Sequence, residues 1–258
     1  MPEGRSNAAP AVTRAVQILD YLANFGPDIG VSAIAAGLGL SKSTCYNILQ
    51  ALASESLVIK DSRFPVYRLG PRLVELGMTS RLQNSHRDKI MKIMLQLITP
   101  LSVTCLVAQP LVGDRGMIIV DRISPAHSDA LIVPVGTVFP ITSPALGAAF
   151  LAWRDIDEVT ANVRQFGDVS QNELQRLASS LDIVRQRGYS WATSEYQPGT
   201  AAIAAPVFGP DLEISLILCL IGPAERLPLE DLEAVGNQLL TAAREIAGLL
   251  ARGGSPGS

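Results

Sequence analysis

The chain has 258 residues, of which 48% are hydrophobic and 17% are charged, and its formal net charge is −3 at pH 7. This length favours two domains, and the apolar content is sufficient for a core in each. Apolar runs such as residues 216–221 are far shorter than the roughly 20 residues that span a bilayer, and the N-terminus lacks a signal-peptide pattern. We therefore expect a cytoplasmic protein with no membrane partner.

The first 70 residues contain the pattern of a small DNA-binding domain. Helical spacing predicts a helix over residues 13–25, a short helix over residues 33–36 capped by Ser32, and a third helix from residue 42 to about 54 capped by Ser41. Residues 57–59 and 66–69 flank turn residues, which predicts a hairpin. Three helices and a hairpin are typical of a winged helix-turn-helix domain, whose helix after the turn lies in the DNA major groove.

The third predicted helix has two different faces. Its apolar residues recur at helical spacing, and the opposite face carries one cation, several hydroxyls and amides. Lys42 is suited to phosphate or guanine, hydroxyls to phosphate oxygens, and the amide of Asn47 or Gln50 to an adenine edge. An ordinary solvated surface is the alternative. Cations outnumber acids between residues 41 and 76, which favours DNA. The candidate contacts from this reasoning are Ser41, Lys42, Ser43, Thr44 and Asn47 in the helix and Lys60, Arg63 and Arg68 in the wing.

The remainder of the chain alternates between helical and strand patterns. We expect a linker helix over residues 71–88 and a further helix over residues 89–99. The strands are expected at residues 103–108, 117–123, 130–133, 189–194, 201–208 and 213–221, and the other helices at 144–153, 156–166, 174–187 and 229–251. Short turns between strands predict an α+β fold with a mainly antiparallel sheet flanked by helices. The predicted parts are a disordered arm (1–10), the DNA-binding domain (11–70), the linker (71–88), a second domain (89–252) and a flexible tail (253–258).

The pattern of reactive residues argues against an enzyme. Cys45, Cys105 and Cys219 are isolated in apolar segments, which indicates buried thiols instead of a disulfide framework or a metal site. The histidines, His86 and His127, lie in polar stretches that read as a linker and a loop. The sequence contains neither a nucleophile elbow nor a phosphate-binding glycine loop. We expect no catalytic residue, no metal and no cofactor.

Several segments in the same order resemble the IclR-type transcriptional regulators. They are residues 37–44 (Gly-Leu-Gly-Leu-Ser-Lys-Ser-Thr), 67–73 (Tyr-Arg-Leu-Gly-Pro-Arg-Leu), 134–136, 145–147, 187–189, 195–199 (Glu-Tyr-Gln-Pro-Gly), 203–207 and 222–223. The resemblance covers almost the whole chain. It implies a winged helix-turn-helix, a linker helix and a GAF-like effector-binding domain.

The resemblance also implies partners. Such regulators bind palindromic operators in double-stranded DNA as homodimers or dimers of dimers, and a small organic effector in the C-terminal domain alters this binding. The resemblance also adds Tyr46 and Arg14 to the residues expected to face DNA. Arg14 equally fits an ion pair that is exposed to solvent or lies within the domain. Position 47 often carries Arg in the family, so Asn47 is a departure.

The C-terminal departures concern the effector. Relatives that sense small carboxylates have an acid, a Cys and two hydroxyls where this chain has Ala192, Ala202, Cys219 and Ile221, and Ala148 replaces a common Lys. Without these groups a buried carboxylate would be unpaired, which is costly. We therefore expect a relatively apolar effector, aromatic or acyl-bearing, oriented by Thr142, Ser143 or Cys219. Ordinary core packing is the alternative for the apolar positions.

Together these features predict a regulator, expected to be a repressor, of a catabolic operon. Two alternatives remain open: an activator of the same family, or a DNA-binding protein whose C-terminal domain serves only oligomerisation.

Overall fold

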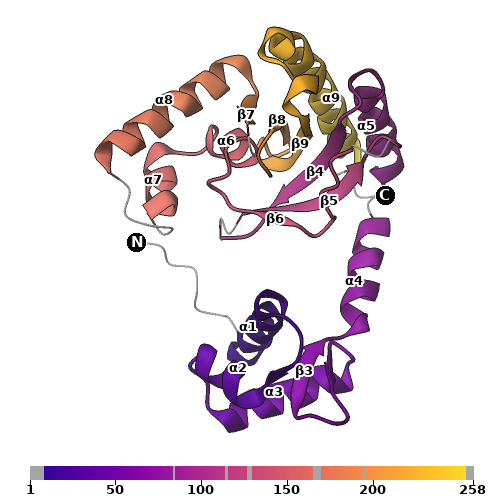
Figure 1. Ribbon diagram of the computed structural model, residues 1–258, viewed down its shortest axis with the longest axis vertical. Helices are drawn as coiled ribbons and strands as arrows, with labels where there is room; N and C mark the ends of the chain where they lie inside the picture. The colour runs from indigo at the N-terminus through magenta and orange to yellow at the C-terminus, as the bar shows by residue number, and fades with distance from the viewer. Residues whose placement is uncertain are drawn as a thin grey trace. The chain divides into compact units, whose positions relative to one another are not determined.

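The computed structural model describes residues 9–83, 85–113, 116–126, 130–164, 170–193 and 196–253. Its chain divides into two compact units, residues 1–84 and 85–258, which are considered separately (Figure 1). Most of the predicted arm, the loop histidine His127 and residues 254–258 of the predicted tail lie outside the described residues. The mixed helix and sheet composition confirms the predicted α+β class.

The N-terminal unit contains four helices and a small antiparallel sheet of order β1-β3-β2 within its described residues. The elements are α1 (Pro10–Phe25), β1 (Ile29–Gly30), α2 (Val31–Gly37), α3 (Lys42–Ser54), β2 (Val58–Lys60), β3 (Val66–Leu69) and α4 (Pro71–Leu82). The apolar faces of α1, α2 and α3 meet in one core with the side chains of Val58 and Tyr67 from the hairpin. Helix α3 and the β2–β3 hairpin therefore belong to one packed body.

Two predictions for this unit were wrong in detail, and one strand was missed. Helix α1 begins at Pro10, within the predicted arm, because Pro is suited to the first helical position. Helix α2 begins at Val31 with Gly30 at its N-cap, so Ser32 lies inside the helix and does not cap it. The two-residue strand β1 was not predicted, because two residues are too few to show an alternating pattern.

The C-terminal unit has a six-stranded antiparallel sheet of order β6-β5-β4-β9-β8-β7. Its elements are α5 (Arg87–Leu101), β4 (Thr104–Pro110), β5 (Met117–Ile123), β6 (Val138–Phe139), α6 (Leu146–Leu151), α7 (Ile156–Arg164), α8 (Gln171–Arg187), β7 (Ser190–Thr193), β8 (Thr200–Phe208), β9 (Ile214–Pro223) and α9 (Leu232–Gly253). Short 3-10 helices at Ala224–Arg226 and Leu229–Asp231 precede α9.

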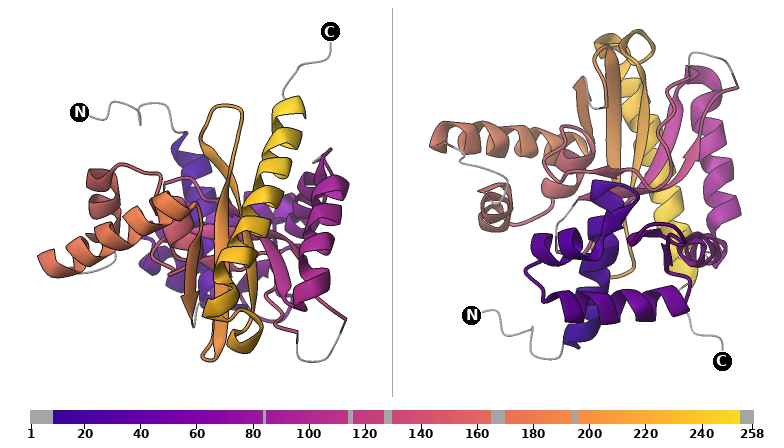
Figure 2. Two further views of the ribbon diagram at one scale, coloured as in Figure 1. Left: turned by 90° about the horizontal axis from the view of Figure 1, so that it is seen from above. Right: turned by 60° about the horizontal axis from the view of Figure 1, so that its bottom comes forward.

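Helices cover both faces of this sheet. Helices α5 and α9 pack on one face, and α6, α7 and α8 contribute to the core on the other (Figure 2). Because successive side chains of a strand point to opposite faces, Ala201 and Ile203 of β8 face α5 and α9, whereas Ala202 and Ala204 face α6. Strands β8 and β9 are therefore apolar on both sides, which explains their nearly continuous apolar sequence.

The predicted linker helix over residues 71–88 is not a single helix. Helix α4 ends at Leu82 and α5 begins at Arg87. Arg87 makes a bidentate ion pair with Asp121 on β5, with its Nη2 atom 2.8 Å and its Nε atom 3.1 Å from Oδ1. This pair raises the pKa of Arg87. It fixes the first residue of α5 to the sheet.

The predicted strand at residues 130–133 does not form. The carbonyl oxygen of Leu131 accepts a hydrogen bond of 2.6 Å from the Thr104 hydroxyl, and that of Val133 accepts one of 3.2 Å from Arg122. Side chains thus take the carbonyls that a strand would offer to a neighbour. The edge strand next to β5 is β6 instead, with Phe139 opposite Met117.

The connection between the wing and α4 is very tight at Gly70. A Cβ atom built there would lie 2.1 Å from the carbonyl oxygen of Ser56, whereas one built at Gly77 in the middle of α4 would meet nothing within 4 Å. Gly70 also donates its N–H to the carbonyl of Leu57 at 2.8 Å. The position therefore requires glycine for space.

We predict opposite effects for two glycine substitutions. Gly70→Ala should lower the free energy of unfolding of the N-terminal unit by about 1–3 kcal/mol because the added methyl group displaces backbone. Gly77→Ala should raise the stability of α4 by about 0.5–1 kcal/mol because alanine loses less conformational entropy in a helix. Urea titrations followed by circular dichroism measure both changes. Equal effects of the two substitutions would contradict the packing at Gly70.

Candidate nucleic-acid interface and effector region

The N-terminus of α3 is organised by Ser41, as predicted. The Ser41 hydroxyl accepts a hydrogen bond from the Thr44 backbone N–H at 3.1 Å and donates one to the Thr44 hydroxyl at 2.8 Å. The Ser43 hydroxyl lies 3.1 Å from that of Ser41. Three hydroxyls are thereby gathered at the positive end of the helix dipole, where the first turn contains no acid. Such an arrangement favours an anion.

The two faces of α3 are separated as its sequence predicted. Cys45 and Leu49 are completely buried, and burial raises the pKa of the Cys45 thiol. The polar candidates Lys42, Ser43, Tyr46 and Asn47 are exposed, and Thr44 is half-buried. This surface of α3 is available for contact with a partner.

The amide of Gln50, considered as an alternative to Asn47, has a structural role. Its Nε2 atom donates to the hydroxyl of the buried Tyr67 at 3.1 Å. The bond joins α3 to strand β3 and holds the Gln50 side chain against the wing. Both amides are exposed, but Asn47 lies one turn closer to the N-terminus and the Gln50 amide is engaged by Tyr67, so Asn47 is the better placed of the two for base contact.

The wing presents its cations in different directions. Lys60 is paired with Tyr67 and Arg68 with Ile59, so the two cations belong to opposite faces of the β2–β3 ribbon. Arg63 lies in the turn, where the Asp61 carboxylate accepts the backbone N–H groups of Arg63 and Phe64 at 2.8 and 2.9 Å. These bonds lower the pKa of Asp61. They fix the turn, and Lys60, Arg63, Arg68 and the more distant Arg14 on α1 are all exposed.

The predicted effector residues form adjacent rows across the sheet. One row runs Ala192, Ala202, Ile221 and Thr104 over strands β7, β8, β9 and β4, and the next contains Cys219. All these predicted residues pack on the α6 face, where Ala148 also lies. Ala202, Cys219 and Ile221 have no exposed surface. The structure therefore brings these residues together, in a closed core.

The polar candidates around this core differ in position. The Ser143 side chain is buried, and its oxygen accepts the Gly147 backbone N–H at 3.1 Å. Thr142 is exposed. The Cys219 thiol lies 3.6 Å from the carbonyl oxygen of Leu220, to which it donates. Of these three, Ser143 and Cys219 lie within the described core and Thr142 lies at its surface.

Two buried hydroxyls in the same rows were not predicted from the sequence. Thr104 is completely buried, and Ser190 is 1% exposed. Thr104 donates to the Leu131 carbonyl, and Ser190 donates to the Ala145 carbonyl at 2.7 Å. Ser190 is opposite Ala204, the neighbour of Cys219 in its row. Ser190 and Ala192 are two residues apart on one strand, so the alternation of side chains could have placed Ser190 on the same face as Ala192. The sequence alone could not show that Thr104 lies in the row, because this depends on the pairing of β4 with β9.

Charged groups are scarce in this core. Asp121 is the one charged residue among the buried residues of the described ranges, and its partner Arg87 holds it on the α5 side of the sheet. In the same ranges, no cluster of three or more possible metal ligands is present. Nor is any helix long and apolar enough to cross a membrane, as far as the described residues extend. The core can therefore offer hydroxyls, a thiol and apolar surface, and one half-buried cation, Arg122, lies at the end of the Cys219 row with its guanidinium bonded to the Val133 carbonyl.

Two family models match the chain. Residues 11–62 match the IclR helix-turn-helix domain, and residues 82–248 match the C-terminal domain of bacterial transcriptional regulators of the IclR type. Among curated relatives, the glycerol operon regulatory protein of Streptomyces coelicolor is 28% identical, with 94% of this chain and 95% of that protein covered. The transcriptional repressor IclR of Escherichia coli is 24% identical, with 95% and 90% covered.

Solved structures have the same fold. An IclR transcriptional regulator from Alicyclobacillus acidocaldarius is similar with a TM-score of 0.78 and 26% identity, and the match covers 94% of this chain and 99% of that chain. An IclR family regulator from Brucella abortus is similar in fold, with a TM-score of 0.83 at 20% identity and coverage of 95% and 94%.

The cap at Ser41 leads to a stability prediction. Ser41→Ala should lower the free energy of unfolding of the N-terminal unit by about 1 kcal/mol, because the Thr44 N–H loses its acceptor. Ser43→Ala is the matched control, and a change of less than about 0.5 kcal/mol is expected for this exposed hydroxyl. Thermal unfolding of the two variants compares them directly. Equal destabilisation would show that Ser41 is not the cap in solution.

Proposed function

Because the chain belongs to the IclR family of bacterial transcriptional regulators, we propose that it represses a catabolic operon and that a small, relatively apolar effector controls this repression. The chain is a regulator and not an enzyme, in line with its relatives. Relatives named as an operon regulator and a repressor support repression of an operon. The protein then acts in the cytoplasm, where the bacterial chromosome lies.

The observation that carries the DNA-binding proposal is the exposed polar face of α3. Lys42 and the hydroxyls of Ser41 and Ser43 contact phosphate at the N-terminus of the helix, where the dipole adds to the attraction. Asn47 is placed to read an adenine edge through a bidentate hydrogen bond. Thr44 and Tyr46 flank these contacts, and the wing and Arg14 add cations. The base contacts give specificity, and the phosphate contacts give salt-dependent affinity.

Self-association is supported by apolar surface on the N-terminal unit. Val12 and Val16 on α1 are 63% and 47% exposed, and Val74 and Leu82 on α4 are 68% and 73% exposed. Solvent-exposed apolar side chains of this kind are typical of contact surfaces. A homodimer, or a dimer of dimers, would present two α3 helices to a palindromic operator.

The proposed effector region is the core around Ala202, Cys219 and Ile221. Its described buried polar groups are hydroxyls and a thiol, which suit an aromatic or acyl group better than a small carboxylate. The region must open to admit a ligand, because these side chains are fully buried. Effector binding would then be coupled to a different conformation, and operator and effector would change each other's affinity by the same factor.

The closed core equally favours a second candidate function, in which the C-terminal unit serves only assembly. A panel of aromatic and acyl compounds separates the two. A compound that raises the melting temperature and changes operator affinity supports sensing, whereas a panel without such a compound supports assembly alone.

We predict that Lys42→Ala weakens operator binding and reduces its salt dependence. The slope of log Kobs against log[salt] should become less steep by about one unit for the lost phosphate contact. Lys89→Ala, an exposed lysine on α5, is the matched control and should leave the slope unchanged. Fluorescence anisotropy with operator DNA at several salt concentrations measures both. An unchanged slope for Lys42→Ala would remove this residue from the phosphate contacts.

We also predict that small carboxylates are not effectors. Acetate and pyruvate at millimolar concentration should change neither the melting temperature nor the operator affinity, because Ala192, Ala202 and Ile221 offer a carboxylate no donor. The half-buried Arg122, at the end of the Cys219 row, already donates to the Val133 carbonyl. The apo protein in equimolar sodium chloride controls for ionic strength. A reproducible upward shift of the melting temperature with either acid would contradict the apolar character of the site.

A further inference from the structure

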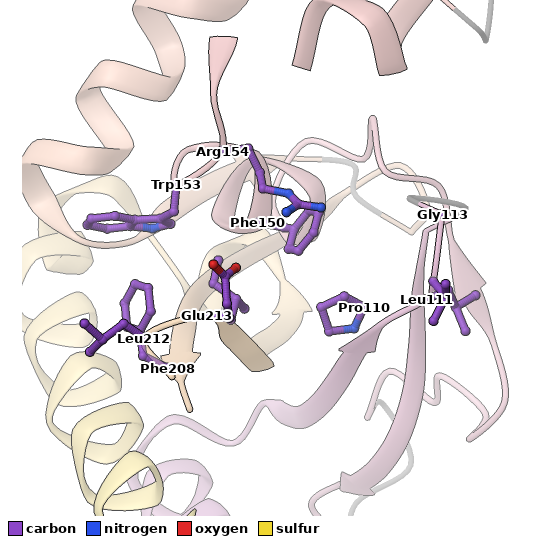
Figure 3. A pocket seen from close by; sticks show the side chains of 11 residues that line it. Pro110, Leu111, Gly113, Phe150, Trp153, Arg154, Phe208, Leu212 and Glu213 are labelled. Carbon is purple, nitrogen blue, oxygen red and sulfur yellow. The ribbon is translucent and has the colours of Figure 1, made fainter. Parts of the chain in front are cut away.

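We propose that a cavity at the tips of the β4–β5 and β8–β9 hairpins binds a small aromatic zwitterion, a molecule with an aromatic ring, a carboxylate and an amine. The cavity has a volume of about 360 Å³, within the range of small-molecule sites. The C-terminal end of α6 forms its third wall (Figure 3). All of its lining residues belong to the C-terminal unit.

This cavity is separate from the core proposed for the effector. Phe208, which lines it, is six residues along β8 from Ala202, a distance of about 20 Å in an extended strand. Both positions lie toward the α6 side of the sheet, but at opposite ends of β8. A ligand here would not contact the row that contains Ala202.

Aromatic side chains from different elements line the cavity. Trp153 and Phe208 meet edge to face, with ring centroids 5.3 Å apart at an interplanar angle of 89°. Phe150 is 5% exposed and forms part of the same lining, whereas Trp153 is 42% exposed. Rings held at such angles can contact both the face and the edge of a planar ligand. The lining therefore selects an aromatic ring.

Two opposite charges stand at the same cavity. The guanidinium carbon of Arg154 lies 4.9 Å from the ring centroid of Phe150, and Glu213 comes from the β8–β9 hairpin. Figure 3 shows the Arg154 guanidinium beside the Phe150 ring, and the Glu213 carboxylate to one side of them on a different element. A ligand with one charge would meet a like charge as well as a partner. A zwitterion can place its carboxylate at Arg154 and its amine at Glu213, through charge-assisted hydrogen bonds.

The β8–β9 turn supports a binding role through Leu212. Its φ angle of 64° lies in the left-handed region, and its side chain is 82% exposed at the cavity. Leucine is disfavoured in this backbone conformation, where glycine would be relaxed, and its exposure is also unfavourable. The backbone N–H of Gly209 bonds the Glu213 carbonyl at 2.8 Å, which fixes the turn. The fixed turn therefore holds the exposed Leu212 side chain at the rim of the cavity, where it can cover a bound ligand.

The test measures binding of three probes to the full chain without DNA. L-Phenylalanine has both charges, phenylacetate has only the carboxylate and phenethylamine has only the amine. Isothermal calorimetry should give L-phenylalanine an affinity at least about 10-fold higher than either single-charge probe. In a Trp191→Phe background, quenching or a blue shift of Trp153 fluorescence should accompany the binding of L-phenylalanine.

Two variants assign the charges to their partners. Arg154→Met should lower the affinity for L-phenylalanine about 10-fold, because the carboxylate of the ligand loses its partner. The variant should then bind L-phenylalanine and phenethylamine with similar affinity. Glu213→Gln should bind L-phenylalanine and phenylacetate with similar affinity, because the amine of L-phenylalanine loses its partner. Arg244→Met on α9 and Glu230→Gln, both exposed elsewhere, are the matched controls and should bind as the parent does. Unchanged melting temperatures of the unliganded variants establish that they fold.

The proposal fails if L-phenylalanine does not bind, or if the two cavity variants retain the affinity and probe preference of the parent. Because the readout is ligand binding alone, either failure leaves the proposed control of operator binding unaffected. Likewise, loss of operator binding in Lys42→Ala says nothing about this cavity.

Discussion

The pairing of β8 with β9 is the constraint on which the C-terminal unit depends. With Ala202 opposite Ile221 and Ala204 opposite Cys219, one set of side chains faces α6 and the other faces α5 and α9. A shift of one residue would exchange the two sets and send larger residues such as Ile203 to the α6 side. Since both faces are buried, the core fixes the register, and the register in turn fixes which side chains a ligand could meet.

The N-terminal unit separates support from contact in a similar way on a single helix. Cys45 and Leu49 anchor α3 in the core, and the bond from Gln50 to Tyr67 ties it to the wing. The polar side chains of the other face are thereby presented without contributing to the packing of the unit. A partner can bind them with little rearrangement, which is the condition for a recognition element on a rigid scaffold.

Much of this architecture was accessible from sequence because it rests on local periodicity. Helix α3, its cap at Ser41 and the hairpins follow from spacings of three, four and two residues. The failures have non-local causes. Residues 130–133 resemble a strand, but their carbonyls are bound by Thr104 and Arg122, 27 and 11 residues away for Leu131 and Val133.

The same distinction between local and non-local causes applies to the candidate sites. The resemblance selected Ala192, Ala202, Cys219 and Ile221 by position in the chain, and the structure places them on one face of the sheet. It could not show that the packing of α6, α7 and α8 leaves Ala202, Cys219 and Ile221 without exposed surface. The cavity between Trp153, Phe208 and Glu213 was also inaccessible, because its walls come from segments more than fifty residues apart in sequence (residues 153 and 208) and only tertiary packing joins them.

The row of Ala192, Ala202, Ile221 and Thr104 has an evolutionary consequence. Its four strands are joined by backbone hydrogen bonds, which do not depend on the identity of the side chains. A single nucleotide change can therefore place a hydroxyl or a larger apolar group in the row while the ladder stays intact. If the row contacts the effector, as proposed above, copies of one such scaffold can change their ligand preference after gene duplication by single substitutions within the row.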